Sequence, residues 1–302
     1  QLRTMRHAVM GNVDEPSTST AITVNPYTHN PNVAWDKLKK TQKFRKIIVN
    51  IPKTPVAARL VRFVCISDTH NRKNGPLLNI PNGDVLLHAG DFTMHGSLHE
   101  VEAFNTWMGS LDHKYKVVIA GNHELMLDSK ICHSGGHKSA HCGELSPSSG
   151  STIQNINAKE LLKNCIYLED TSVQINGINI YGTPWQPKHL DWAFNLKRGQ
   201  ECLDKWLKIP TNTDILLSHT PPVGHGDLCD SGVRAGCVEL LMVVQRRVQP
   251  KYHVFGHIHE GYGVTTDGTT IYINASSCNK MYQATNQPIV FDFPFPASYC
   301  ED

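Results

Sequence analysis

The sequence predicts an α/β fold with mixed β-sheets. Five short apolar runs alternate with segments of helical periodicity, and an Asn-Gly pair between two apolar runs indicates a β-hairpin. The five runs are almost continuously apolar, which is typical of strands covered on both faces. They comprise residues 62–67, 84–90, 116–121, 214–219 and 253–257.

The segment after the second predicted strand has the pattern of an amphipathic helix. Within residues 97–111, apolar side chains recur every three or four positions. Ser97 and Glu100 have the spacing of a capping box at the start of this helix. The other predicted elements are a helix at 237–248, the hairpin at 172–182, and closing strands at 270–276 and 288–293.

Composition divides the chain into an extension, a domain and a short tail. Residues 1–60 show little periodicity, so we expect a flexible or loosely docked N-terminal extension. The predicted domain spans residues 61–296, and residues 297–302 form a C-terminal tail. A Ser/Gly-rich insertion at 129–158 contains cysteines and histidines, but their spacing fits no established zinc motif, so we expect a surface loop.

Bulk properties argue against several classes of partner. Apolar residues make up 40% of the 302 positions, enough for a sizeable core. The formal net charge of +2 gives no support for nucleic-acid binding. No window approaches the roughly 18 apolar residues of a membrane span, so no membrane partner is predicted. Several of the nine cysteines lie within apolar patterns, which favours buried free thiols and a cytoplasmic location.

A short polar cluster follows each of the five predicted strands. Because ligands gather at the carboxyl ends of strands in α/β sheets, we expect these clusters to converge on one crevice. The candidate metal ligands in the clusters are Asp68, His70, Asp91, Asn122, His219, His257 and His259.

The chemical types of these side chains predict a pair of divalent metal ions. Carboxylate, carboxamide and imidazole ligands suit Mn, Fe or Zn better than a thiolate site would. Seven ligands are too many for one ion, whereas two ions ~3.5–4 Å apart are typical of phosphoryl hydrolysis. With Asp68, Asp91 and a bridging hydroxide the centre keeps one positive charge, which attracts a singly charged phosphodiester. That hydroxide is the predicted nucleophile, and His123 is the predicted general acid for the leaving alkoxide.

These motifs, in this order, resemble those of the calcineurin-like metallophosphoesterase superfamily. The closer resemblance is to the metallophosphoesterase domain-containing proteins 1 and 2. It is carried by FVCISDTH (63–70), GDVLLHAGDFT (83–93), VVIAGNHE (117–124), residues 237–263 and DGTTIYINAS (267–276). The resemblance implies a four-layer αββα sandwich of two mixed β-sheets flanked by helices. It also implies activity on small phosphodiesters, including cyclic nucleotides.

The resemblance further implies which residues hold each ion, with Mn expected to support activity in vitro. The first ion would take Asp68, His70, Asp91 and His259, and the second would take Asp91, Asn122, His219 and His257. Asp91 would then bridge the two ions and be catalytically essential. Glu124 either holds the imidazole of His123 or of a ligand histidine, or only begins a helix.

The sequence also bears on two alternatives to a phosphodiesterase. Protein Ser/Thr phosphatases of the superfamily have an Asp-Arg-Gly continuation after the second motif, whereas Phe-Thr-Met-His follows Asp91 here. The second alternative is a catalytically weak or inactive scaffold, or a nucleotide-binding protein, with the same fold. The complete set of seven ligands favours the enzyme.

Overall fold

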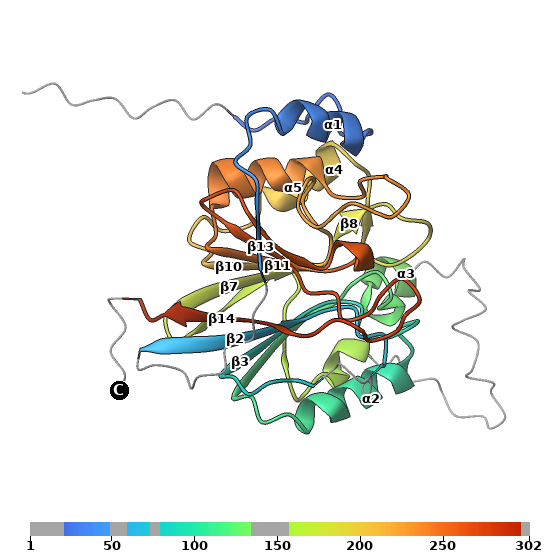
Figure 1. Cartoon of the computed structure of the whole chain (residues 1–302). Helices are drawn as coiled ribbons and strands as arrows, with labels where there is room; N and C mark the ends of the chain where they lie inside the picture. The colour runs from blue at the N-terminus through green and yellow to red at the C-terminus, as the bar shows by residue number, and fades with distance from the viewer. Residues whose placement is uncertain (1–20, 49–58, 73–78, 134–156, 297–302) are drawn as a thin grey trace, which may run out of the picture.

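Two β-sheets pack face to face, and helices cover both outer faces (Figure 1). The computed structural model describes residues 21–48, 59–72, 79–133 and 157–296. Helices α4 (Gln200–Trp206) and α5 (Val238–Val243) lie over the larger sheet, and α2 (Leu98–Gly109) lies under the smaller one. The predicted four-layer sandwich is therefore confirmed.

The larger sheet has seven strands within the described residues, and its interior is parallel. In spatial order its strands are β1 (Arg45–Ile47), β12 (Gly263–Thr266), β13 (Ile271–Asn274), β11 (Tyr252–Phe255), β10 (Ile215–Ser218), β7 (Ile178–Thr183) and β6 (Thr171–Ile175). The four strands from β13 to β7 pair parallel with one another, and the outer strands β6, β12 and β1 pair antiparallel.

The smaller sheet has five strands in the described part of the chain, four of them parallel. Its order is β14 (Ile289–Pro294), β2 (Leu60–Ile66), β3 (Val85–Ala89), β4 (Tyr115–Ile119) and β5 (Ile166–Tyr167). A short pair, β8 (Gln186–Pro187) with β9 (Asn195–Leu196), lies apart from both sheets. The remaining elements are α1 (Pro31–Leu38), α3 (Ser129–His133), short turns at Leu125–Leu127, Ala158–Leu161 and His259–Gly261, and a π-helical turn at Val244–Val248.

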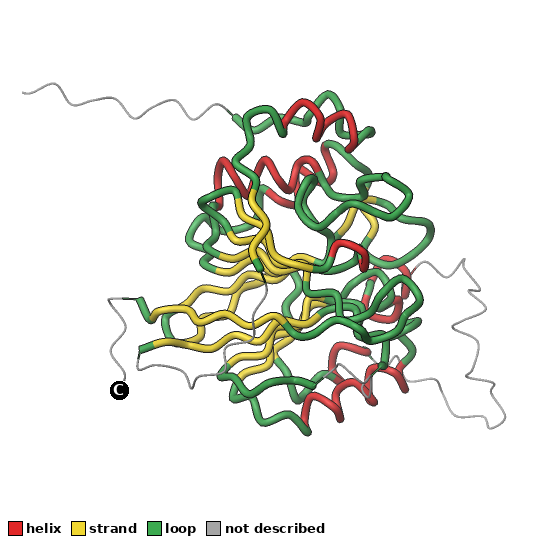
Figure 2. Tube along the Cα trace, viewed as in Figure 1, coloured by secondary structure: helices red, strands yellow, loops and turns green. Residues whose placement is uncertain are grey.

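Alternate side chains of the buried strands fill two separate cores. Phe63 and Cys65 of β2 face the core between the sheets, and Val64 and Ile66 face the core shared with α2. Figure 2 shows the two strand layers enclosed by helices. This arrangement explains the continuous apolar runs, because both faces of each strand are covered.

The predicted local signals agree with the structure. All five apolar runs overlap strands, namely β2, β3, β4, β10 and β11. Ser97 and Glu100 form both hydrogen bonds of the capping box that starts α2. The hairpin joins β6 to β7 through Asn176 and Gly177, which both have positive φ.

Residues 21–48 of the predicted extension, which the sequence left as either flexible or loosely docked, pack on the domain. Trp35 of α1 is only 7% exposed, and its ring lies 5.2 Å from the Arg234 guanidinium. Strand β1 extends the larger sheet by pairing with β12. One buried aromatic residue and a three-residue edge strand produce no recognisable periodicity, so the sequence pattern could not locate these contacts.

The structure bears on three other predictions, which concern the insertion and the tail, the cysteines, and membrane spans. Residues 134–156 of the insertion and the tail 297–302 lie outside the described residues. Cys65 and Cys237 are free and buried as predicted, and Cys165 is free and half-buried. Among the described residues, no helix combines the length and hydropathy that a membrane crossing requires.

Candidate metal centre

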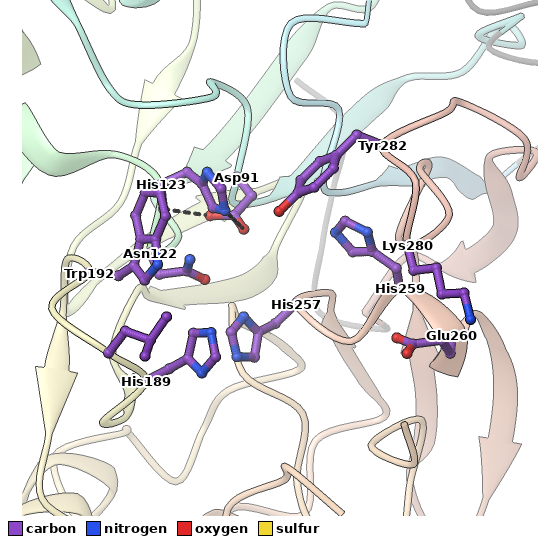
Figure 3. Close-up of a pocket in the computed structure, with 11 residues that line it drawn as sticks. Asp91, Asn122, His123, His189, Trp192, His257, His259, Glu260, Lys280 and Tyr282 are labelled. Carbon is purple, nitrogen blue, oxygen red and sulfur yellow. Dashed lines mark hydrogen bonds and ion pairs between the residues drawn. The ribbon is translucent and has the colours of Figure 1, made fainter. Parts of the chain in front are cut away.

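The predicted ligands and His123 converge at one end of the paired sheets. Asp68 and His70 follow β2, Asp91 follows β3, and Asn122 with His123 follows β4. From the other sheet, His219 follows β10, and His257 with His259 follows β11. Figure 3 shows five of these residues around one pocket: Asp91, Asn122, His123, His257 and His259.

One group of potential ligand atoms contains Asp68, His70 and His259. The Nε2 atom of His259 lies 3.4 Å from Asp68 Oδ1 and 3.3 Å from His70 Nε2. All three donor atoms lie within 4.8 Å of one another. This spacing is compatible with one shared cation.

A second group contains Asp91, His219 and His257, with Asn122 beside them. The Nε2 atom of His219 lies 3.2 Å from Asp91 Oδ2 and 3.0 Å from Asn122 Oδ1. The ring of His257 lies 5.0 Å from that of His219, measured between centroids. Asp91 Oδ2 is also 3.9 Å from His70 Nε2, so Asp91 is positioned between the two groups.

Main-chain carbonyls fix the tautomer of four histidines at this centre. A carbonyl oxygen only accepts hydrogen bonds, so each Nδ1 must carry the proton, and the Nε2 of the neutral ring is left with a free lone pair. The Nδ1 to oxygen pairs are His70 with Thr93 (3.0 Å), His123 with Met94 (2.6 Å), His219 with Ala89 (2.9 Å) and His259 with Asn279 (2.9 Å).

The facing lone pairs fit bound cations. Nε2 of His70 and Nε2 of His259 are both acceptors and lie 3.3 Å apart, so they cannot hydrogen-bond to each other as neutral rings. His219 Nε2 likewise faces two oxygen acceptors. Either a proton on one of the facing nitrogens or a cation between the acceptors satisfies such an arrangement, and this donor set suits Mn, Fe or Zn.

The electrostatic environment leaves the carboxylates charged. Burial raises the pKa of Asp68 and of Asp91, but the neighbouring imidazoles of His259 and His219 outweigh burial and hold both pKa values below the ordinary range. Burial lowers the pKa of His70 to about 4 and that of His257 to about 3. Burial also lowers the pKa of His219 and of His259, but the Asp91 and Asp68 carboxylates outweigh burial and raise both, that of His219 to about 9. Metals bind ionised carboxylates and neutral imidazoles, so these two rings would release a proton when a metal binds.

The backbone is strained at four of the candidate ligands. The φ angles of Asp68, His70, Asp91 and His257 are 50°, 42°, 53° and 68°. Non-glycine residues rarely adopt such positive φ angles, and each sparsely populated conformation costs ~1–3 kcal/mol. All four residues lie just beyond the strand ends from which the chain turns at the crevice.

Two glycines allow the close approach of backbone to the carboxylates. A Cβ atom at Gly256 would overlap Asp68 Oδ2, and one at Gly121 would overlap Asp91 Oδ1. Both glycines come directly before candidate ligands, His257 and Asn122. Their role here is the absence of a side chain, because neither has a positive φ.

Glu124 precedes the turn Leu125–Leu127, but its carboxylate does not cap that turn and instead supports the backbone around Asp91. Its fully buried carboxylate accepts hydrogen bonds from the backbone N–H groups of Asp91 (2.9 Å), Gly121 (2.6 Å) and Thr93 (2.9 Å). It also accepts one from the Thr93 hydroxyl, at 2.8 Å. The sequence had suggested an imidazole as its partner, whereas the structure shows the main chain.

We expect Glu124→Ala to lower the free energy of unfolding by ~3 kcal/mol or more, because buried N–H groups lose their acceptor. Urea unfolding would measure this loss, and elemental analysis would show reduced metal content. Glu102→Ala, at an exposed position on α2, is the control and should change neither quantity. An unaltered unfolding midpoint for Glu124→Ala would contradict the supporting role.

The pocket also contains residues that the sequence did not indicate. Its volume is about 370 Å³, within the range of small-molecule sites. The additional lining residues are His189, Leu190, Trp192, Glu260, Lys280 and Tyr282. They come from loops without periodicity. The only signal in the sequence that could have pointed to them is the presence of aromatic residues in otherwise polar loop segments.

Comparison with known proteins gives consistent matches along most of the chain. Residues 61–261 match the family described as Calcineurin-like phosphoesterase. UPF0046 protein T07D4.2 of Caenorhabditis elegans is 48% identical over 281 residues, covering 91% of this chain and 71% of that protein. Metallophosphoesterase domain-containing protein 1 of Homo sapiens is 47% identical over 286 residues, covering 91% and 86%. UPF0046 protein C25E10.12 of Caenorhabditis elegans is 44% identical over 281 residues, covering 91% and 96%.

Proposed function

Because this chain belongs to the calcineurin-like phosphoesterase family, we propose that it hydrolyses phosphodiesters at two adjacent divalent-metal positions. The predicted family resemblance is confirmed by these matches. The observation that carries the proposal is the pair of acceptor-lined groups with Asp91 between them. A single shared carboxylate allows two cations to act on one phosphoryl group.

In this proposal Asp68, His70 and His259 hold one cation, and Asn122, His219 and His257 hold the other. Asp91 contributes to both positions. When bound, such a pair of Mn, Fe or Zn ions supplies Lewis-acid activation of the phosphoryl group and of water. The protein keeps the ligands in place through the carbonyl-fixed tautomers and through the hydrogen bonds of Glu124 to the backbone.

The charge of the pocket favours a diester over a more highly charged phosphate. Lys280 is the only lysine or arginine among the described lining residues, and its ammonium group is 2.5 Å from Asp230 Oδ2. The described lining therefore has no further lysine or arginine to neutralise additional negative charge on a phosphate. This favours a singly charged diester, such as a small cyclic nucleotide, as the substrate.

His123 is the residue proposed to donate a proton to the leaving oxygen. Its Nδ1 donates to the Met94 carbonyl, so the proton given to the leaving oxygen would come from Nε2 of the doubly protonated ring. That Nε2 lies 3.9 Å from Asp91 Oδ2, close enough to reach a substrate bound at the two metal positions that share this carboxylate. Because His123 also lies within ligand distance of His70 and Asp91, an alternative role as a metal ligand must be tested separately.

Turnover of bis-p-nitrophenyl phosphate with Mn²⁺ tests the proposed function directly. We expect release of nitrophenolate by the metal-loaded protein, loss of turnover with a chelator, and recovery when Mn²⁺ is added back. Cyclic nucleotides should then be cleaved under the same metal conditions. Protein that carries a full metal complement and still leaves all of these diesters intact would instead favour a binding scaffold.

A further inference from the structure

The loop between β8 and β9, residues 188–194, forms one wall of the pocket. Three of its residues, His189, Leu190 and Trp192, line the pocket beside the candidate metal centre. Figure 3 shows His189 and Trp192 on the same side of the pocket as Asn122 and His123. None of these loop residues is a member of the proposed ligand set.

The side chain of Asn195 holds this loop in one conformation. Its Nδ2 donates to the carbonyl oxygens of Leu190 (3.0 Å) and Trp192 (2.9 Å), and more weakly to that of His189 (3.5 Å). Its Oδ1 accepts from the backbone N–H of His189 at 3.0 Å. One amide group therefore links three successive parts of the loop, which makes the loop pre-organised.

The loop is also anchored to the candidate metal centre itself. The backbone N–H of Ala193 donates to the carbonyl oxygen of Asn122, at 3.0 Å. The indole of Trp192 stacks on the imidazole of His123, with centroids 4.2 Å apart and an interplanar angle of 29°. Displacement of the loop would therefore disturb the backbone of a candidate ligand and the ring of the proposed acid.

Leu190 combines a backbone conformation that is unfavourable for leucine with a highly exposed apolar side chain. Its φ is 50°, in the left-handed region that branched residues avoid, and the residue is 67% exposed. Neither backbone preference nor burial in the core explains a leucine at this position. The side chain lines the pocket, where a bound ligand would cover it.

We propose that the β8–β9 loop is a specificity element that binds an uncharged aromatic ring, carried by the organic part of the substrate, against Leu190 and Trp192. The inference rests on the proposed function, since it places the phosphoryl group of the same substrate at the metal centre. The chemistry of the wall supports an uncharged ring, because an indole and an aliphatic side chain provide apolar area and no formal charge. Asn195 acts as a positioning residue, through the loop that it holds.

Two phosphonates that differ only in their substituent test this assignment. The Mn²⁺-loaded protein is titrated calorimetrically with phenylphosphonate and with methylphosphonate, and the ratio of their dissociation constants is compared among variants. The ratio isolates the ring, because both probes present the same anionic group to the metal centre. We expect the phenyl compound to bind ~10-fold more tightly to the unmodified protein, as burial of a ring predicts.

Leu190→Ala should reduce this preference to about 2–3-fold while the methylphosphonate affinity stays unchanged. Asn195→Ala should reduce the preference in the same direction, because the loop then loses its fixed conformation. Leu207→Ala is the matched control: this leucine is also exposed, at the end of α4, and does not line the pocket. The control should keep the full preference.

The outcomes separate this inference from the proposed function. Equal affinity of the unmodified protein for both phosphonates, or an unchanged preference in Leu190→Ala, would overturn the specificity role even if diesters are hydrolysed. A preference that depends on Leu190 in a protein that hydrolyses no diester would support the subsite and refute the hydrolase. Failure to bind either phosphonate would refute the loop assignment together with the metal–anion site on which it rests.

Discussion

Asp91→Ala should bind neither metal ion stably and should lose phosphodiesterase activity by more than ~100-fold. Asp91 lies between both groups of potential ligands, 3.2 Å from His219 Nε2 and 3.9 Å from His70 Nε2. Its removal therefore deprives each group of a negative charge in a buried environment. Changes to residues that merely support metal ligands cost 10–100-fold in affinity or activity, so loss of a shared ligand should exceed that range.

Metal content measured by elemental analysis, alongside turnover, distinguishes this effect from general damage. Asp112→Ala provides the control, because that carboxylate is exposed and lies outside the pocket. Asp91→Asn separates charge from shape, and we expect it to retain the fold while holding less metal than the unmodified protein. A fully metallated Asp91→Ala protein would show that Asp91 is not a shared ligand.

His123→Ala should retain its metal and lose ~10²–10⁴-fold in the hydrolysis of esters with alkoxide leaving groups, the usual contribution of general acid catalysis. The loss should be much smaller for bis-p-nitrophenyl phosphate, because nitrophenolate scarcely needs a proton to depart. The physical basis is the geometry of the ring, which is fixed by Met94 and Trp192 with Nε2 available to the pocket. Parallel kcat measurements with a cyclic nucleotide and the nitrophenyl ester would reveal the difference.

His99→Ala, at an exposed position on α2, is the matched control for loss of an imidazole and should leave both rates intact. An equal loss on both ester types would argue against proton donation by His123. Loss of metal from His123→Ala would instead assign this residue to the metal-binding set, consistent with its proximity to His70 and Asp91. Metal analysis before the kinetic measurements therefore decides between the two roles.

The strands and the order of their terminal motifs were predictable because their signals are local. A buried strand needs a short apolar run, a helix start needs Ser97 and Glu100 at the correct spacing, and a tight hairpin needs Asn176 and Gly177. Each of these depends on neighbours within a few residues. The sequence therefore determined the fold class, the central strands and the identities of the candidate ligands.

The tertiary structure decided how those ligands are held and what surrounds them. The tautomers of His70 and His219 depend on carbonyls of Thr93 and Ala89, which are distant in sequence. The support of Asp91 by Glu124 likewise crosses from one strand end to the next.

The docking of residues 21–48 and the pocket wall at 188–194 also depend on non-local contacts. Trp35 meets Arg234 across about two-thirds of the chain, and Ala193 bonds to the backbone of Asn122. These segments lack periodicity of their own, because their conformations are fixed by the surfaces against which they pack. A linear pattern records which side chains are present, whereas the folded chain determines which of their atoms face one another.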